Sequence, residues 1–106
     1  MIDTVEILKI ILYKSQKGYV GNAVTPRENI KVVMIPSRKR KEMWLLFAEA
    51  EGKLEWIGTA FINLSSKVPI RYGNQNLTYL GSARIKGVEH YDFEVMMDKK
   101  GRILIV

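Results

Sequence analysis

"HYDFEVMMDKKGRILIV", residues 90–106, holds two apolar runs separated by a short polar stretch that ends in glycine. Apolar and polar residues alternate strictly in the first run, which is typical of a β-strand with one buried face. A turn at "DKKG" (98–101) would let "RILIV" return antiparallel beside it. The segment therefore predicts a β-hairpin, with these side chains on its apolar face: Tyr91, Phe93, Val95 and Met97.

The same turn pattern occurs at "SQKG" (15–18) and "EAEG" (49–52), again between runs typical of strands. A type I turn followed by a glycine at positive φ forms a three-residue hairpin loop with a β-bulge. With that loop at Gly52, Leu46 is expected opposite Trp56. Three such turns predict three hairpins.

Two more runs extend the β pattern, "IKVVMI" (30–35) and "LTYLGSARIKG" (77–87). The second is expected to pair with "EHYDFEV" (89–95), which would set Arg84 opposite Asp92 and Lys86 opposite His90. We therefore expect a single, mainly β domain over residues 1–106. Its architecture is predicted as a small antiparallel barrel or sandwich of about seven or eight strands.

The N-terminal segment 2–13 fits two structures. Apolar residues at helical spacing, with Asp3 and Glu6 as a capping box, are compatible with a helix. The β-branched content and the turn at 15–18 favour a strand, which is the prediction.

Composition excludes several kinds of site. The 106 residues include no cysteine, so disulfides, thiolate metal sites and cysteine nucleophiles are absent. With one histidine and no glycine-rich phosphate loop or GxSxG motif, neither a catalytic triad nor a cofactor site is predicted. The chain also shows no signal-peptide pattern and no apolar run of about 18 residues, so we expect a cytoplasmic protein without membrane contact.

The net charge of +6 is distributed in blocks along the chain. Residues 9–41 contain nine Lys or Arg and a single acid, Glu28. Further basic turns are expected at 67–71 and 99–102, whereas Arg84 and Lys86 are assigned to cross-strand ion pairing. Such asymmetry suggests a polyanionic partner.

The strongest candidate site is the run Arg38, Lys39, Arg40 and Lys41, expected in a hairpin loop with Pro36 at its base. Adjacent cations repel one another, and a phosphate backbone would supply the missing counter-charge; a solvated loop is the alternative. Cations and tyrosines in neighbouring turns would extend the site: Lys14, Lys17, Tyr19, Lys67, Arg71 and Tyr72. Tyr13, Tyr79, Trp44 and Trp56 are assigned to the core.

This pattern predicts a non-enzymatic protein that binds single-stranded DNA or RNA with low sequence specificity, because phosphate contacts carry no base information.

Two other functions stay open. Strands 43–49 and 54–62 are apolar on both faces, which fits a homodimer or adaptor, or else a central strand pair in a tightly curled barrel. The C-terminal "RILIV" could also pair with another chain if it lies at a sheet edge. A metal-dependent nuclease using His90, Asp92 and Glu94 is the weakest alternative, since same-face neighbours on a strand are about 7 Å apart.

Overall fold

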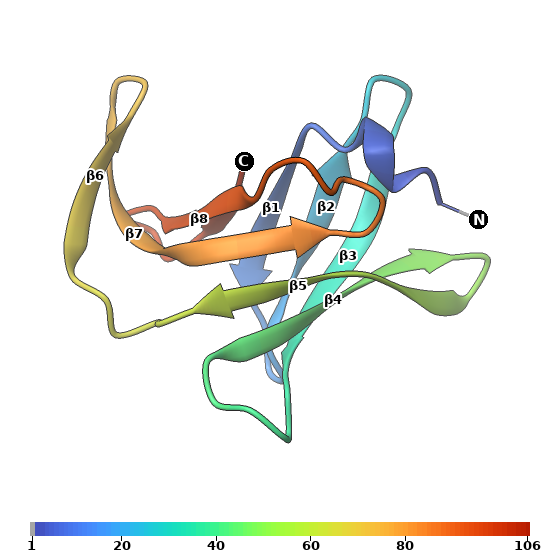
Figure 1. The fold of residues 1–106 in the computed structure, drawn as a ribbon, viewed down its shortest axis with the longest axis horizontal. Coiled ribbons are helices and arrows are strands. Elements are labelled where there is room, and N and C mark those ends of the chain that lie inside the picture. Colours follow the sequence, from blue (N-terminus) through green and yellow to red (C-terminus); the bar gives the residue numbers. More distant parts are fainter. Residues whose placement is uncertain (1) are drawn as a thin grey trace.

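The computed structural model describes residues 2–106, which form nine β-strands and one short 3₁₀ turn (Figure 1). The turn η1 spans Thr4–Glu6. The strands are β1 (Lys9–Lys14), β2 (Tyr19–Val24), β3 (Asn29–Pro36), β4 (Met43–Ala50), β5 (Lys53–Ile62), β6 (Val68–Tyr72), β7 (Gln75–Ile85), β8 (Phe93–Met97) and β9 (Ile103–Ile105).

The strands form a closed antiparallel barrel, which confirms the predicted fold. Their order is β5-β4-β3-β2-β1-β9-β8-β7-β6, and a further pairing of β5 with β7 closes eight of them into a ring. Strand β6 lies outside the ring and pairs with β7. Closure satisfies the backbone groups that an open sheet would leave unpaired along its edges.

The interior is filled by side chains that alternate along each strand. Large residues that are less than 2% exposed include Ile10, Met34, Leu46, Ile57 and Phe93. At one end, the buried Ile7 joins this core, and the hydroxyl of the buried Thr4 donates a hydrogen bond to the carbonyl of Lys86.

The strand predicted over 2–13 is confirmed only from Lys9 onward, and the residues before it form a short turn. The carboxylate of Asp3 accepts a hydrogen bond from the N–H of Val5 at 3.2 Å and caps the turn η1. The strand begins only at Lys9, where pairing with Val24 of β2 starts.

All three predicted turns join antiparallel neighbours, but their geometries differ. The turn at 98–101 has the expected form, with Gly101 at φ +83° and its N–H donating to the carbonyl of Asp98. At the β4–β5 turn, Ala50 pairs with Lys53, so the loop has two residues. Glu51 and Gly52 both have positive φ there, +54° and +77°, as a type I′ turn requires. The three-residue prediction was wrong at this turn. Four residues, 15–18, separate the paired Lys14 and Tyr19 in the remaining turn.

The shorter β4–β5 turn changes the register of the hairpin. Phe47, and not Leu46 as predicted, lies opposite Trp56. A bulge at this point then places Gly58 opposite Leu46. The predicted pairing of Arg84 with Asp92 is confirmed, because Nε of Arg84 lies 3.3 Å from Oδ1 of Asp92. Lys86 lies beyond the end of β7, where its N–H donates to the carbonyl of Ile57 at 2.7 Å, and among residues 2–106 it forms none of the predicted ion pairs.

The C-terminal strand is not an edge strand. β9 pairs with β1 on one side and with β8 on the other. The predicted use of "RILIV" to recruit another chain was therefore wrong, because its backbone groups already have partners within the barrel. As for the membrane, residues 2–106 contain no helix with the length and apolarity needed to cross one.

Candidate nucleic-acid interface

Four chain segments meet at one end of the barrel, here called the basic end. Because neighbouring strands run antiparallel, alternate connections return to the same end, which places turns 15–18, 37–42 and 98–101 at one end of the barrel. The segment 63–67 leaves β5 at this end as well, where the N–H of Ile62 donates to the carbonyl of Glu42 at 2.9 Å. Residues far apart in the sequence thus share one surface.

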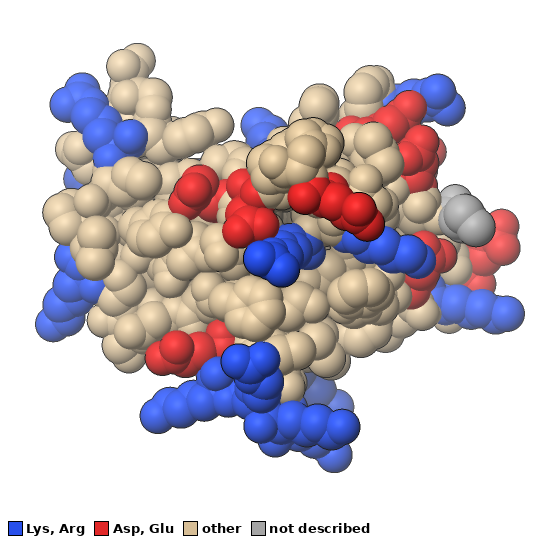
Figure 2. All heavy atoms as spheres, viewed as in Figure 1, with Lys and Arg blue, Asp and Glu red and all other residues tan. Residues whose placement is uncertain are grey.

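Loop 37–42, which carries four cations, has an organised backbone. The Ser37 hydroxyl accepts hydrogen bonds from the N–H groups of Lys39 and Arg40, at 3.1 and 3.4 Å. The N–H of Ser37 donates to the carbonyl of Met43 at 2.9 Å, which closes the base of the loop. In Figure 2 the largest group of Lys and Arg surrounds this loop, at the bottom of the view. The backbone therefore holds the four cations on a projecting hairpin.

The cations of the basic end are exposed and lack carboxylate partners. Within residues 2–106, none of the following nine forms an ion pair: Lys14, Lys17, Arg38, Lys39, Arg40, Lys41, Lys67, Lys99 and Lys100. Ion pairs in the same residues involve other cations, such as Arg102 with Asp98 and Arg27 with Glu6. The basic end therefore carries a positive field that the described part of the chain leaves uncompensated.

Tyr19 does not belong to this surface, although the sequence placed it among the binding residues. Its side chain is 5% exposed and packs edge-on against Trp44, with ring centroids 5.8 Å apart. Burial raises the pKa of its hydroxyl. Nζ of Lys14 lies 5.0 Å from the Tyr19 ring centroid. The buried Tyr19 ring therefore forms a cation–π contact with Lys14, and it is not available to stack on a base.

The predicted residues of segment 67–72 divide between two places. Lys67 lies directly before β6, at the end of the segment that leaves the basic end, whereas Arg71 and Tyr72 lie on β6 near the tip of the β6–β7 hairpin. In Figure 1 this hairpin rises well away from loop 37–42. Tyr72 is 49% exposed and lines a hollow with Lys9 and Arg102. It therefore belongs to a separate part of the surface.

Two features of the basic end were not in the predicted binding set. Lys99 and Lys100 project from the β8–β9 turn, where Asp98 holds the backbone by accepting from the N–H groups of Lys100 and Arg102 at 3.0 and 2.9 Å. Tyr13, expected in the core, is 49% exposed at the end of β1. The strand alternation could have identified it, because Ile10 and Leu12 point inward on both sides of Ile11 and so turn Tyr13 outward.

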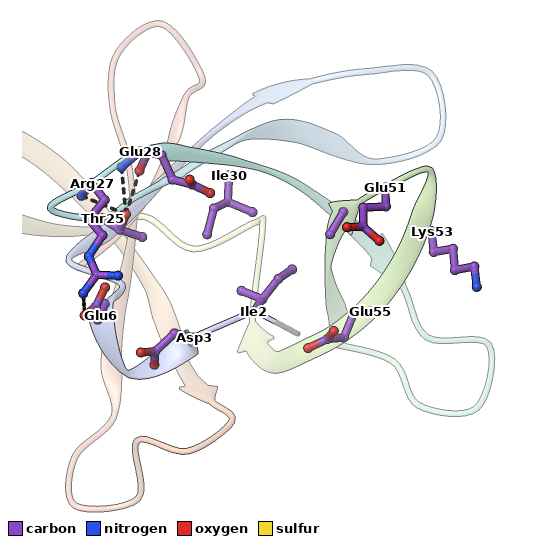
Figure 3. Close-up of a pocket in the computed structure, with 11 residues that line it drawn as sticks. Ile2, Asp3, Glu6, Thr25, Arg27, Glu28, Ile30, Glu51, Lys53 and Glu55 are labelled. Atoms are coloured by element: carbon purple, nitrogen blue, oxygen red, sulfur yellow. Dashed lines mark hydrogen bonds and ion pairs between the residues drawn. The ribbon is translucent and has the colours of Figure 1, made fainter.

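The opposite end of the barrel is rich in acids. A hollow of about 410 Å³ lies there among η1, the turn at 25–28 and the β4–β5 turn (Figure 3). Its lining includes Asp3, Glu6, Glu28, Glu51 and Glu55, with Arg27 and Lys53 as the cations. Arg27 lies 3.5 Å from Glu6, and the Lys53 side chain points away from the hollow in Figure 3. The barrel is therefore electrically bipolar.

The histidine and carboxylates weighed for a metal site are not gathered into one. Asp92 pairs with Arg84, and Glu94 accepts a hydrogen bond from Tyr79, which raises the pKa of that tyrosine. Among the side chains of residues 2–106, no group of three or more His, Asp or Glu is arranged to hold a metal ion.

Comparison of the chain with models of protein families, with curated protein sequences and with solved structures finds no match in any of the three.

Proposed function

We propose that this chain binds single-stranded nucleic acid, DNA or RNA, at the basic end of its barrel, without a chemical step. The observation that carries the proposal is the set of nine exposed cations at this end, none of which forms an ion pair within residues 2–106. Phosphates supply a regular series of negative charges to such a surface, and the release of condensed counterions drives the binding.

A single strand fits this surface better than a duplex. Within residues 2–106 the only helical element is the three-residue turn η1, so no helix is available to enter a major groove. Tyr13, half-exposed near the end of β1 that leads into the first turn, offers a face on which an unpaired base can stack. Stacking of that kind contributes on the order of 1–3 kcal/mol per base and tolerates any sequence.

Sequence specificity is expected to be low. The contacts come mainly from lysine and arginine side chains on turns, and these reach phosphates without reading base edges. The organised backbone of loop 37–42 fixes where the cations lie, which favours affinity over discrimination between sequences.

The test is a fluorescence-anisotropy titration of labelled single-stranded DNA, single-stranded RNA and duplex DNA over a series of salt concentrations. Replacing Arg38, Lys39, Arg40 and Lys41 by alanine should reduce the log–log salt slope for single strands by about 3, at roughly 0.7 per phosphate contact. The matched control replaces four cations towards the opposite end by alanine: Arg27, Lys31, Lys53 and Lys86. It changes the net charge equally and should leave the slope near that of the wild type.

Two results would contradict the proposal. Absence of binding at low salt would remove nucleic acid as the ligand. Equal losses in the two variants would mean that overall net charge, and not the basic end, attracts the strand.

A further inference from the structure

The outer surface of β3, β4 and β5 is apolar, although it faces away from the barrel core. We call it the β3–β5 face; its members are Val33, Ile35, Met43, Leu45, Phe47, Leu54, Trp56 and Phe61. The three members on β5 are the most exposed: Leu54 is 58% exposed, Trp56 45% and Phe61 41%. The N-terminal turn does not cover this surface, because it packs at the end of the barrel, where Thr4 donates to the carbonyl of Lys86.

The apolar side chains of this face are contiguous. Val33 lies opposite Phe47, and Phe47 lies opposite Trp56, so three neighbouring strands contribute to one row. Ile35 and Leu45 form a parallel row beside it. Cross-strand neighbours on one side of a sheet are in contact, and a continuous exposed patch of this kind marks an interaction surface.

Opposite charges flank the face at the two ends of β4. Loop 37–42 precedes the strand with four cations and one acid, Glu42. At the other end of the strand, Glu49, Glu51 and Glu55 lie around the β4–β5 turn. Lys53 lies among them, and Nζ of Lys31 is 3.6 Å from a carboxylate oxygen of Glu49, which leaves Glu51 and Glu55 without an ion pair among residues 2–106. A chain that docks on the face therefore meets positive charge at one end and negative charge at the other.

We propose that a second copy of this chain docks on the β3–β5 face, with the two β4 strands antiparallel. Two identical faces can meet about a two-fold axis that runs either along β4 or across it. An axis along β4 would bring the two basic loops together. An axis across β4 sets the basic loop of each copy against the acidic turn of the other, so the charge pattern selects this arrangement.

The position of the two-fold axis along β4 determines which charged residues of the two copies face each other. An axis that crosses β4 between Leu45 and Phe47 packs the apolar centres of the two faces together. Lys41 lies four residues before Leu45, and Glu51 lies four residues after Phe47. The same axis therefore places Lys41 of one copy level with Glu51 of the other. The face is complementary to itself in both hydrophobicity and charge, and this favours a second copy over an unrelated partner.

The dimer would share loop 37–42 with the proposed nucleic-acid surface but would leave the rest of that surface open. It covers β3–β5, whereas β1 and β9, with Lys14, Lys17, Lys99 and Lys100 at their ends, lie further around the barrel. Those cations stay accessible in the dimer.

Sedimentation velocity over a range of protein concentrations tests the association. The wild type should form a dimer whose dissociation constant rises with salt, because screening weakens the attraction between loop and turn. Trp56→Ser should raise the dissociation constant by at least about tenfold, as expected for a central aromatic residue. The matched control is Val68→Ser, which removes a 56% exposed side chain on β6, outside the face. A monomeric wild type, or equal effects of the two variants, would overturn the proposal.

Because the chain has no cysteine, the orientation can be tested by disulfide crosslinking. A mixture of the Lys41→Cys and Glu51→Cys proteins should crosslink faster than either protein alone. Faster crosslinking of Lys41→Cys with itself would show that the two strands run parallel and would contradict the arrangement. Since neither experiment contains nucleic acid, their outcome is separate from that of the titration above.

Discussion

Phe47 lies directly opposite Trp56 on the outside of the barrel, and the residue that follows Trp56 turns inward. The two-residue turn at Glu51 and Gly52 sets this register, which leaves Trp56 45% exposed and Ile57 fully buried. The bulge after Trp56 then places Phe61 opposite Met43, on the same outer side. β-Bulges are known to redirect side chains in this way. The apolar β3–β5 face exists because of this local change in register.

The inward and outward sides of β4 can be tested by alanine substitution of adjacent leucines. Leu46 is fully buried, so Leu46→Ala should lower the free energy of unfolding by about 2–5 kcal/mol through the cavity that it leaves. Leu45→Ala, on the outer face, should cost about 1 kcal/mol or less in the monomer. Urea denaturation at low protein concentration measures both. Equal losses would contradict the assignment of the two faces.

The β4–β5 turn carries a strained residue. Glu51 has φ +54°, a region that costs a side chain with a β-carbon roughly 1 kcal/mol or more and that asparagine tolerates better. Glu51→Asn should therefore stabilise the protein by about 0.5–1 kcal/mol in thermal or urea unfolding. Glu51→Gln is the control, because it removes the same charge and keeps the strain. A gain of similar size in the control would assign the effect to charge.

The basic end should act as one surface even though its cations come from distant segments. Replacing Lys99 and Lys100 by alanine should lower the salt slope for single-stranded DNA by about 1.4, at roughly 0.7 per contact. Alanine at Lys53 and Lys86, towards the other end, should leave the slope unchanged. If the two double variants change the salt slope by the same amount, the segments of the basic end do not form a common binding surface.

The β8–β9 turn should make stability depend on pH. Burial alone would raise the pKa of Asp98, but hydrogen bonds from the Arg102 guanidinium and from the N–H groups of Arg102 and Lys100 outweigh it, so the pKa lies below its ordinary value. A carboxylate with a lowered folded-state pKa stabilises the protein above its unfolded pKa of about 3.9, and this contribution is lost as the pH falls through the folded value.

Asp98→Asn measures that contribution. At neutral pH the variant should be less stable by about 1–2 kcal/mol, because the charge-assisted bond from Nε of Arg102, 2.6 Å from Oδ2, becomes a neutral one. The difference from the wild type should shrink as the pH falls below about 4. Thermal unfolding at several pH values gives the comparison, and a difference that does not change with pH would assign the loss to packing alone.

The sequence by itself was sufficient to predict strands, hairpins and a small antiparallel barrel. Alternation in "HYDFEV" depends on residues two apart, and the turns depend on three or four consecutive residues, so both signals are local. The pairing of Arg84 with Asp92 follows from the same local spacing. The exposed cations of loop 38–41 were also predictable, because four adjacent charges have no place in a core.

Tertiary structure alone decided which residues share a surface. Closure of the ring by β5 and β7 depends on contacts between distant strands, and it brings Lys14, Lys67 and Lys99 to the same end. Trp56 is exposed because it pairs with Phe47, and a β-bulge after it turns Phe61 to the same outer face, since a shift of one position moves a side chain to the other face of a sheet. Tyr19 is buried since its neighbours across the sheet, Met34 and then Leu46, point inward. These properties arise from pairing between strands, which local patterns do not determine.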